Sequence, residues 1–329
     1  MNKGRRQICQ MLLASGAAPA LTIFTSAMAA SQPYPSKPVR LIVPYAPGGG
    51  SDALSRLVAQ GLGTNVPGTF VVENVGGAGG SVGLGNLVRA DPDGHSLILL
   101  STSHASNAAV MKLNYDVTKD ISPIGLIAAG PWVLVTNPAF GVNSLAELIK
   151  KAKVDPGSIN YATSGQGSST HLATELFAKK AGIAISHIPY RSSGAGIVDL
   201  LSNRVQIMLA SAPTVAEYVR NGKLKALGVS TKERSSVLPG IPTLQEQGIT
   251  GYAEQLWYAL AAPATTPDSI VAKLSTALQK TLSQSDVATS FAREGVAPKW
   301  STPSALKDII SADVKRWKET VRMASITIQ

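Results

Sequence analysis

Short apolar runs alternate with segments of helical spacing along most of this chain of 329 residues. Residues 39–45, 69–75 and 96–102 are apolar runs of strand length, and the two segments between them place apolar side chains at helical intervals. This β-α-β-α-β order predicts a parallel sheet, because parallel neighbours need a crossover connection that is usually a helix. The same order returns over residues 158–230. The sequence therefore predicts two α/β units.

Two further apolar runs are longer than a single unit needs. Residues 124–141 lie between the two units, and residues 251–267 follow the second. Each run is long enough to pass from one unit to the other, and three segments with helical spacing follow, over residues 267–324. We therefore expect the last part of the chain to pack against the first unit.

The first residues have the pattern of an export signal. Lys3, Arg5 and Arg6 precede a weakly polar stretch over residues 11–28, and small residues at positions 27 and 29 fit a cleavage site after Ala29. A membrane anchor is disfavoured because glycine and proline interrupt the stretch. We expect a signal peptide over residues 1–29 and a periplasmic mature chain, and the route of export, general or twin-arginine, stays open.

Cysteine and charge exclude several function classes. The only cysteine, Cys9, lies in the expected signal, so the mature chain can form no disulfide, thiolate metal site or cysteine nucleophile. Loss of three basic residues with the signal lowers the formal net charge from +10 to +7. The lysines and arginines are scattered along the chain, which indicates a solvated surface with a preference for anions and no nucleic-acid partner.

A glycine loop between the first expected strand and helix allows two hypotheses. The spacing Gly48-x-Gly50-x-x-Ala53, followed by Glu73 at the end of the next strand, fits a dinucleotide fingerprint. Asp52 would, however, place negative charge among the phosphates. The second unit has a matching strand, glycine loop and helix around residues 160–182, which favours an anion such as a carboxylate held between two helix N-termini. The remaining alternative is that both loops only turn the chain and cap helices.

Several longer motifs carry a family resemblance. They include "YPSKPVRLIVPYAPGGGSDALSR", "VVENVGGAGGSVG", "INYATSGQGSSTHLATELF" and "LKALGVSTKERSSVLPGIPTLQEQG". With them the chain resembles the Bug-type substrate-binding proteins, the TctC-like receptors of tripartite tricarboxylate transporters. The resemblance implies an α/β fold of the type II periplasmic-binding-protein kind, with two lobes joined by two crossover segments and a ligand cleft between them. We place lobe 1 at residues 30–130 plus 256–329 and lobe 2 at residues 131–255.

The family's two glycine loops bind one ligand carboxylate, partly through water. Carried onto this sequence, the contacts fall at Tyr45, Ala46, Pro47, Gly48, Gly49 and Asp52 in lobe 1, and at Thr163, Ser164, Gly165, Ser168 and Thr170 in lobe 2. Ser101 and Ser211 end expected strands at the edge where parallel sheets present ligands, so we expect them at the far end of the ligand. His171 could line the pocket from the first turn of its helix.

The resemblance implies a receptor without catalysis or cofactor, and the four histidines lack the spacing of a metal site. We expect a monomer that captures a small organic carboxylate for integral-membrane transporter subunits. The ligand class stays open among di- and tricarboxylates, aromatic acids and acidic amino acids. Two alternatives remain: a periplasmic ligand sensor that serves a membrane signalling protein, and a dinucleotide-dependent oxidoreductase.

Overall fold

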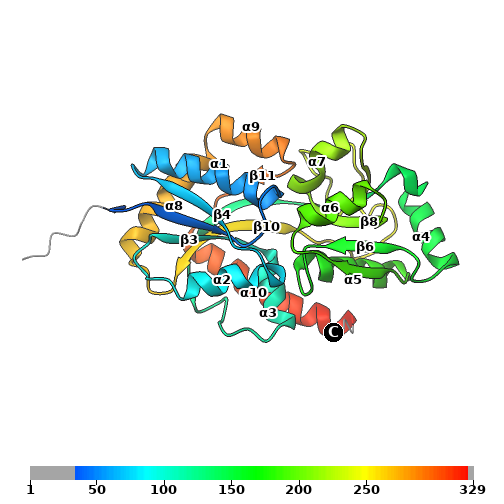
Figure 1. Ribbon diagram of the computed structural model, residues 1–329, viewed down its shortest axis with the longest axis horizontal. Helices are drawn as coiled ribbons and strands as arrows, with labels where there is room; N and C mark the ends of the chain where they lie inside the picture. Colours follow the sequence, from blue (N-terminus) through cyan, green and yellow to red (C-terminus); the bar gives the residue numbers. More distant parts are fainter. Residues whose placement is uncertain (1–33, 325–329) are drawn as a thin grey trace, which may run out of the picture. The chain divides into compact units, whose positions relative to one another are not determined.

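The computed structural model describes residues 34–324, and its strands form two β-sheets (Figure 1). The strands are β1 Val39–Val43, β2 Phe70–Asn74, β3 Ser96–Ser101, β4 Ile121–Gly130, β5 Trp132–Thr136, β6 Asn160–Thr163, β7 Ser186–Pro189, β8 Ile207–Ser211, β9 Lys225–Val229, β10 Leu256–Pro263 and β11 Ala297–Pro298. The first sheet has the order β11-β4-β10-β3-β1-β2, and the second has the order β7-β6-β8-β5-β9. The predicted signal peptide lies outside the described residues.

Helices connect most of these strands. They are α1 Gly50–Asn65, α2 Ser81–Val88, α3 Thr102–Val110, α4 Leu145–Val154, α5 Ser169–Ala181, α6 Ser193–Leu201, α7 Ala212–Arg220, α8 Asp268–Leu282, α9 Ser285–Arg293 and α10 Pro303–Ala324, with short 3-10 helices η1 Ala78–Gly80 and η2 Pro138–Phe140. Helices α1 and α8 cover one face of the first sheet, and helices α2 and α10 cover the other face (Figure 1). The run Leu97–Leu100 is fully buried, as a strand covered on both faces must be.

The two sheets are mixed, and the prediction of parallel sheets holds only in part. Strands β1, β2 and β3 pair in parallel, as do β6, β7 and β8. Strand β10 is antiparallel to both β3 and β4, and β5 is antiparallel to β8 and β9. These exceptions are the strands next to the passages between the two sheets. Strands β5 and β10 each enter their sheet directly from the other lobe. They therefore start at the end of the sheet where the neighbouring parallel strands finish, and run in the opposite direction.

Both expected crossovers are present. Strand β4 ends at Gly130 in the first sheet, and β5 begins at Trp132 in the second. The chain returns between Val229, the last residue of β9, and Leu256, the first residue of β10. The predicted fold class, two α/β lobes joined by two crossover segments, is therefore confirmed. The exact lobe boundaries stay a prediction.

Helix α3 was not predicted, because its sequence lacks an apolar stripe. It is polar even where it is completely buried: His104, Ser106 and Asn107 have no exposed surface. The helix packs against α10 on one side and against α5 of the second lobe on another. It therefore lies between the lobes, where its polar side chains bond to neighbouring backbone, as the Asn107 amide does to the Gly79 carbonyl at 3.0 Å.

Candidate ligand-binding site

A cavity lies between residues of the two lobes. Its volume is about 40 Å³, taken as the space open to the centre of a water molecule. None of the lining side chains is charged, and most carry a hydroxyl group. The lining residues are Tyr45, Ala46, Gly49, Gly50, Ser51, Ser101, Thr102, Ser103, Trp132, Ser164, Ser169, Thr170, Ser192, Ser193, Ser211, Thr214, Leu256 and Tyr258.

Five helices begin at this cavity. Helices α1 and α3 come from the first lobe, and α5, α6 and α7 come from the second; each contributes its first turn or its N-cap residue to the lining. A helix N-terminus carries backbone N–H groups without a helical partner and roughly half a positive charge from the helix dipole. The cavity therefore favours an anion although no lysine, arginine or histidine among residues 34–324 lines it.

The loop between β1 and α1 is shaped by its glycines and by Asp52. Gly48 has a φ of +82°, which favours glycine, and its N–H donates to the Asp52 carboxylate at 3.2 Å. The same carboxylate accepts hydrogen bonds from Arg56 and from Asn74. Burial alone would raise the pKa of Asp52, but these donors outweigh it and hold that pKa below its usual value. Asp52 is thus a buried anion that stabilises the loop, and it does not line the cavity.

Two hydroxyl groups of the first lobe meet beside this loop. The Tyr45 hydroxyl lies 3.0 Å from Ser101 Oγ, and both residues line the cavity. Burial raises the pKa of Tyr45, so its hydroxyl stays protonated at neutral pH. The Ser101 N–H donates to His104 Nδ1 at 3.0 Å, which satisfies an amide at the start of α3. Burial lowers the pKa of His104 to about 4, so that the ring is neutral and able to accept.

The second glycine loop is held by side chains of its own helix. Ser168 is the N-cap of α5; its hydroxyl donates to the Gly165 carbonyl at 2.6 Å and accepts the His171 N–H at 3.3 Å. Thr170 Oγ1 accepts the Ser164 N–H at 3.1 Å. Because the Ser168 hydroxyl is used inside the loop, Ser169 rather than Ser168 reaches the cavity.

Direct contacts join the lobes at the rim of the cavity. Ser103 Oγ of α3 lies 2.9 Å from Ser169 Oγ of α5 and accepts the Ser169 N–H at 3.2 Å. Ser106 Oγ, one turn further along α3, donates to the Gly167 carbonyl at 3.1 Å. On the other side, Gly50 of α1 lies against Pro213 of α7, with no room for a Cβ between them. The helix starts of the two lobes are thus in contact.

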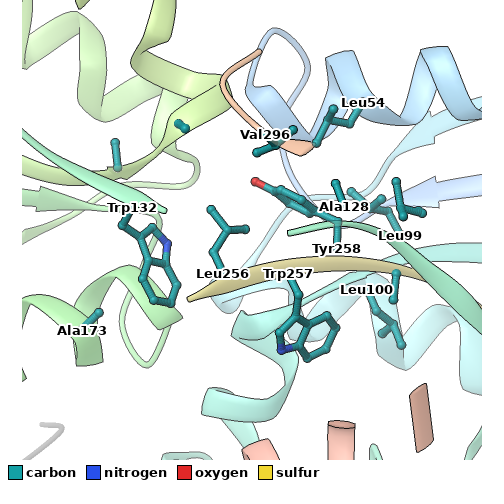
Figure 2. Packing of buried hydrophobic residues seen from close by; sticks show 14 of the residues in the cluster. Leu54, Leu99, Leu100, Ala128, Trp132, Ala173, Leu256, Trp257, Tyr258 and Val296 are labelled. Carbon is teal, nitrogen blue, oxygen red and sulfur yellow. The ribbon is translucent and has the colours of Figure 1, made fainter. Parts of the chain in front are cut away.

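Strand β10 provides another wall, and Figure 2 shows it with Leu256 between Trp132 and Tyr258. The Tyr258 hydroxyl lies near Ser211 of the second lobe and Ser51 of the first, and burial raises the pKa of Tyr258 to about 12. Trp132, the first residue of β5, is 1% exposed and also faces the cavity. Leu256 and Tyr258 are two residues apart on one strand, and this period-2 spacing was the signal that could have identified them.

The structure separates the predicted site residues into two groups. Those that line the cavity are Tyr45, Ala46, Gly49, Ser101, Ser164, Thr170 and Ser211. Those that do not line it are Pro47, Gly48, Asp52, Thr163, Gly165, Ser168 and His171. The lining residues that the sequence did not indicate are Gly50, Ser51, Thr102, Ser103, Trp132, Ser169, Ser192, Ser193, Thr214, Leu256 and Tyr258. Most of the last group are first-turn residues, which become visible only when the helix starts are known.

Other functional features were searched in the part of the chain that the structure describes. Within residues 34–324, no group of three or more His, Cys, Asp and Glu side chains is arranged to hold a metal ion. No helix in that same range combines the length and apolar character needed to cross a membrane. Glu73, the acid of the dinucleotide hypothesis, pairs with Arg40 at 3.4 Å and does not line the cavity.

Two α/β lobes that meet around a hydroxyl-lined cavity, with helix N-termini of both lobes directed into it, define a solute-binding protein. Comparison with known families agrees with this class. The model of the TctC family, described as the tripartite tricarboxylate transporter family receptor, matches residues 54–326, so the chain belongs to this family. The resemblance seen in the sequence motifs is thereby confirmed.

Individual relatives give the same result. The chain is 36% identical to protein BugT of Bordetella pertussis over 293 residues, which is 88% of this chain and 90% of that protein. The structure of MatC from Rhodopseudomonas palustris with bound malate matches with a TM-score of 0.84 and 29% identity, covering 88% of this chain and 100% of MatC. An R. palustris protein with adipate matches with a TM-score of 0.86 and 30% identity, covering 89% and 99% of the two chains.

Proposed function

We propose that this protein is a periplasmic receptor that captures a small organic carboxylate between its two lobes and delivers it to the membrane subunits of a tripartite tricarboxylate-type transporter. The observation that carries the proposal is the convergence of five helix N-termini, from both lobes, on one uncharged cavity. Two similar proteins hold malate and adipate in their structures, and both ligands are carboxylates.

The chemistry of the lining supports an anion held by dipoles. A carboxylate that leaves water loses several hydrogen bonds, and the cost of burying it is acceptable only where new donors replace them. Backbone N–H groups at the helix starts and the hydroxyl of Ser51 are such donors, and the bonded hydroxyl pair of Ser103 and Ser169 keeps one hydrogen to donate. The raised pKa values of Tyr45 and Tyr258 keep two further O–H donors protonated. A hydrogen bond to a charged group contributes about 1.5–3 kcal/mol, so a few of them suffice for micromolar affinity.

The site residues of the proposal come from both lobes. Gly49 and Ser51 belong to the start of α1, and Ser164, Ser169 and Thr170 belong to the second glycine loop and the start of α5. Asp52 and Ser168, which were predicted from the sequence but do not line the cavity, stabilise the two glycine loops in this proposal.

Location and partner follow from the family and the N-terminal sequence. A receptor of a transporter family that carries a signal peptide over residues 1–29 would act in the periplasm and meet its membrane subunits there. A periplasmic sensor would need the same site. Genes for a small and a large integral-membrane component beside the receptor gene would support transport, and a neighbouring membrane sensor would support signalling.

A thermal-shift screen of the mature protein tests the proposal. The screen compares malate, adipate, citrate, benzoate and glutamate with NAD at equal concentration. At a hundredfold excess over its dissociation constant, a ligand adds about 2.7 kcal/mol to the stability of the folded state, a shift of several degrees. We expect at least one acid to stabilise the protein and NAD to have no effect. Stabilisation by NAD alone would contradict the proposal.

A further inference from the structure

Two histidines lie directly behind the second glycine loop and hold its backbone. The Gly167 N–H donates to His171 Nδ1 at 3.2 Å. The Gly165 N–H donates to Thr163 Oγ1 at 3.2 Å, and that same oxygen lies 2.7 Å from His187 Nε2. The backbone amides on both sides of the loop tip are therefore tied to imidazole rings, one directly and one through a hydroxyl.

The rings come from three different elements and stack in parallel. The His171 ring of α5 and the His187 ring of β7 have centroids 3.9 Å apart and an interplanar angle of 11°. The Tyr161 ring of β6 lies 5.0 Å from His187 and 6.4 Å from His171, with interplanar angles of 22° and 24°. Such packing fixes the direction in which each ring edge points, and His171 is only 5% exposed.

The geometry requires a neutral His171. A backbone N–H can only donate, so His171 Nδ1 must keep a free lone pair, and a protonated imidazole has none. Two imidazolium rings at 3.9 Å would also repel each other. The pKa of each ring is lowered to about 4, by burial in both and also by the neighbouring His187 in the case of His171. The other titratable groups facing the pair are Tyr161, whose pKa burial raises well above its usual value, and Glu175, which accepts the Tyr161 hydroxyl.

We propose that His171 and His187 are positioning residues of the binding site: as a stacked pair of neutral rings they hold the backbone of residues 163–169 in the form that presents Ser164 and Ser169 to the cavity. That this loop contacts a ligand rests on the proposed function. The effect of the two histidines on the shape of the loop does not depend on that function. It follows that the loop keeps its form across neutral pH and loses it when acid protonates His171.

Amide hydrogen exchange, resolved by NMR, tests the proposal without a ligand. His171→Phe keeps a flat ring in the stack but offers no acceptor, whereas His171→Asn keeps an acceptor near the position of Nδ1. We expect the protection factor of the Gly167 amide to fall about tenfold in the Phe variant, equivalent to about 1.4 kcal/mol, and to stay within about twofold of wild type in the Asn variant.

His95→Phe is a matched control. His95 Nε2 also accepts a backbone N–H, that of Ser36 at 3.2 Å, and its ring also packs on a tyrosine, Tyr34, at 5.2 Å. It precedes β3 at the end of that strand opposite to Ser101, away from the cavity. We expect this variant to leave the Gly167 amide unchanged.

The pH profile gives a second readout. In the wild type, protection at Gly167 should stay constant from pH 7 to pH 5 and fall towards pH 4, and His171→Asn should remove this dependence. Equal protection in the wild type and the Phe variant, or a His171 ring that titrates near pH 6.5, would overturn the proposal. A failed carboxylate screen would instead overturn the proposed function and leave these measurements unaffected.

Discussion

The replacement Gly50→Ala should act as a wedge between the lobes. Gly50 is the first residue of α1, and its neighbours across the lobe boundary belong to α7. A Cβ at this position would lie 2.4 Å from Pro213 Cβ and 2.9 Å from the backbone carbonyl carbon of the same residue. Non-bonded carbon atoms prefer about 3.5–4.0 Å. Since neither a backbone atom nor the Cβ of a proline ring can rotate away, α1 and α7 would have to separate by roughly 1.1–1.6 Å.

The cost of this wedge falls on the arrangement in which the lobes meet. Inserting a methyl group into a packed contact costs about 1–3 kcal/mol. The proposed function has lobes that part when free and meet around a bound ligand, and this cost should then appear as a loss of affinity of roughly 5- to 150-fold. The effect on the melting temperature should be small, since an open form relieves the contact.

Titration calorimetry with the acid selected by the thermal-shift screen measures the effect. Gly85→Ala in α2 is the matched control, because its Cβ would meet nothing closer than Arg89 Nη1 at 3.6 Å and Tyr115 at 3.7 Å. We expect the control to bind within about twofold of wild type. Wild-type affinity in Gly50→Ala would refute the reasoning, because it would mean that α1 and α7 do not meet in the bound form.

Four further predictions concern the site and the chain. Gly49 has a φ of −93° and no atom within 4 Å of an added Cβ. Gly49→Ala should therefore place a methyl group in the cavity and weaken binding more than about tenfold at an unchanged melting temperature. Unchanged affinity would mean that the ligand does not contact this loop. Tyr258→Phe should weaken binding roughly ten- to a hundredfold by calorimetry through loss of one O–H donor, and full affinity would exclude that donor. His104 has a pKa of about 4 in the folded state and near 6.5 in the unfolded state. Urea titrations should show its contribution to the free energy of unfolding intact above pH 6.5 and reduced by about 3 kcal/mol on approach to pH 4. A free energy of unfolding that is independent of pH over this range would contradict the burial of His104. N-terminal sequencing of exported protein should begin near Ala30, and a retained first residue would contradict periplasmic processing.

Local chemistry made much of the fold predictable. The strand, glycine loop and helix of each lobe depend on residues close together in sequence, and both were located correctly. The two crossovers were predicted because each lies in an apolar run that is longer than one strand and can therefore pass from one lobe to the other. The antiparallel strands β5 and β10 were not predicted, because their direction depends on where the chain enters the second sheet or returns to the first, which no local pattern records.

The site shows where sequence reasoning ends. In the second loop, Ser168 and Ser169 are equivalent in sequence, but the N-cap residue turns its hydroxyl back to the loop and the next residue faces the cavity. A shift of one residue in the helix start decides between them, and helix boundaries are uncertain by at least that much. Ser103 was missed for a different reason: it reaches the cavity through the tertiary packing of α3.

A crystal structure of the mature protein with the selected acid tests the central claim most directly. We predict one carboxylate between the lobes, with its oxygens about 2.7–3.2 Å from backbone N–H or hydroxyl groups at the start of α1 and at the start of α5, and no cationic side chain in contact with it. An acid bound elsewhere on the protein, or held by only one of these two helix starts, would contradict a receptor that binds its ligand between two lobes.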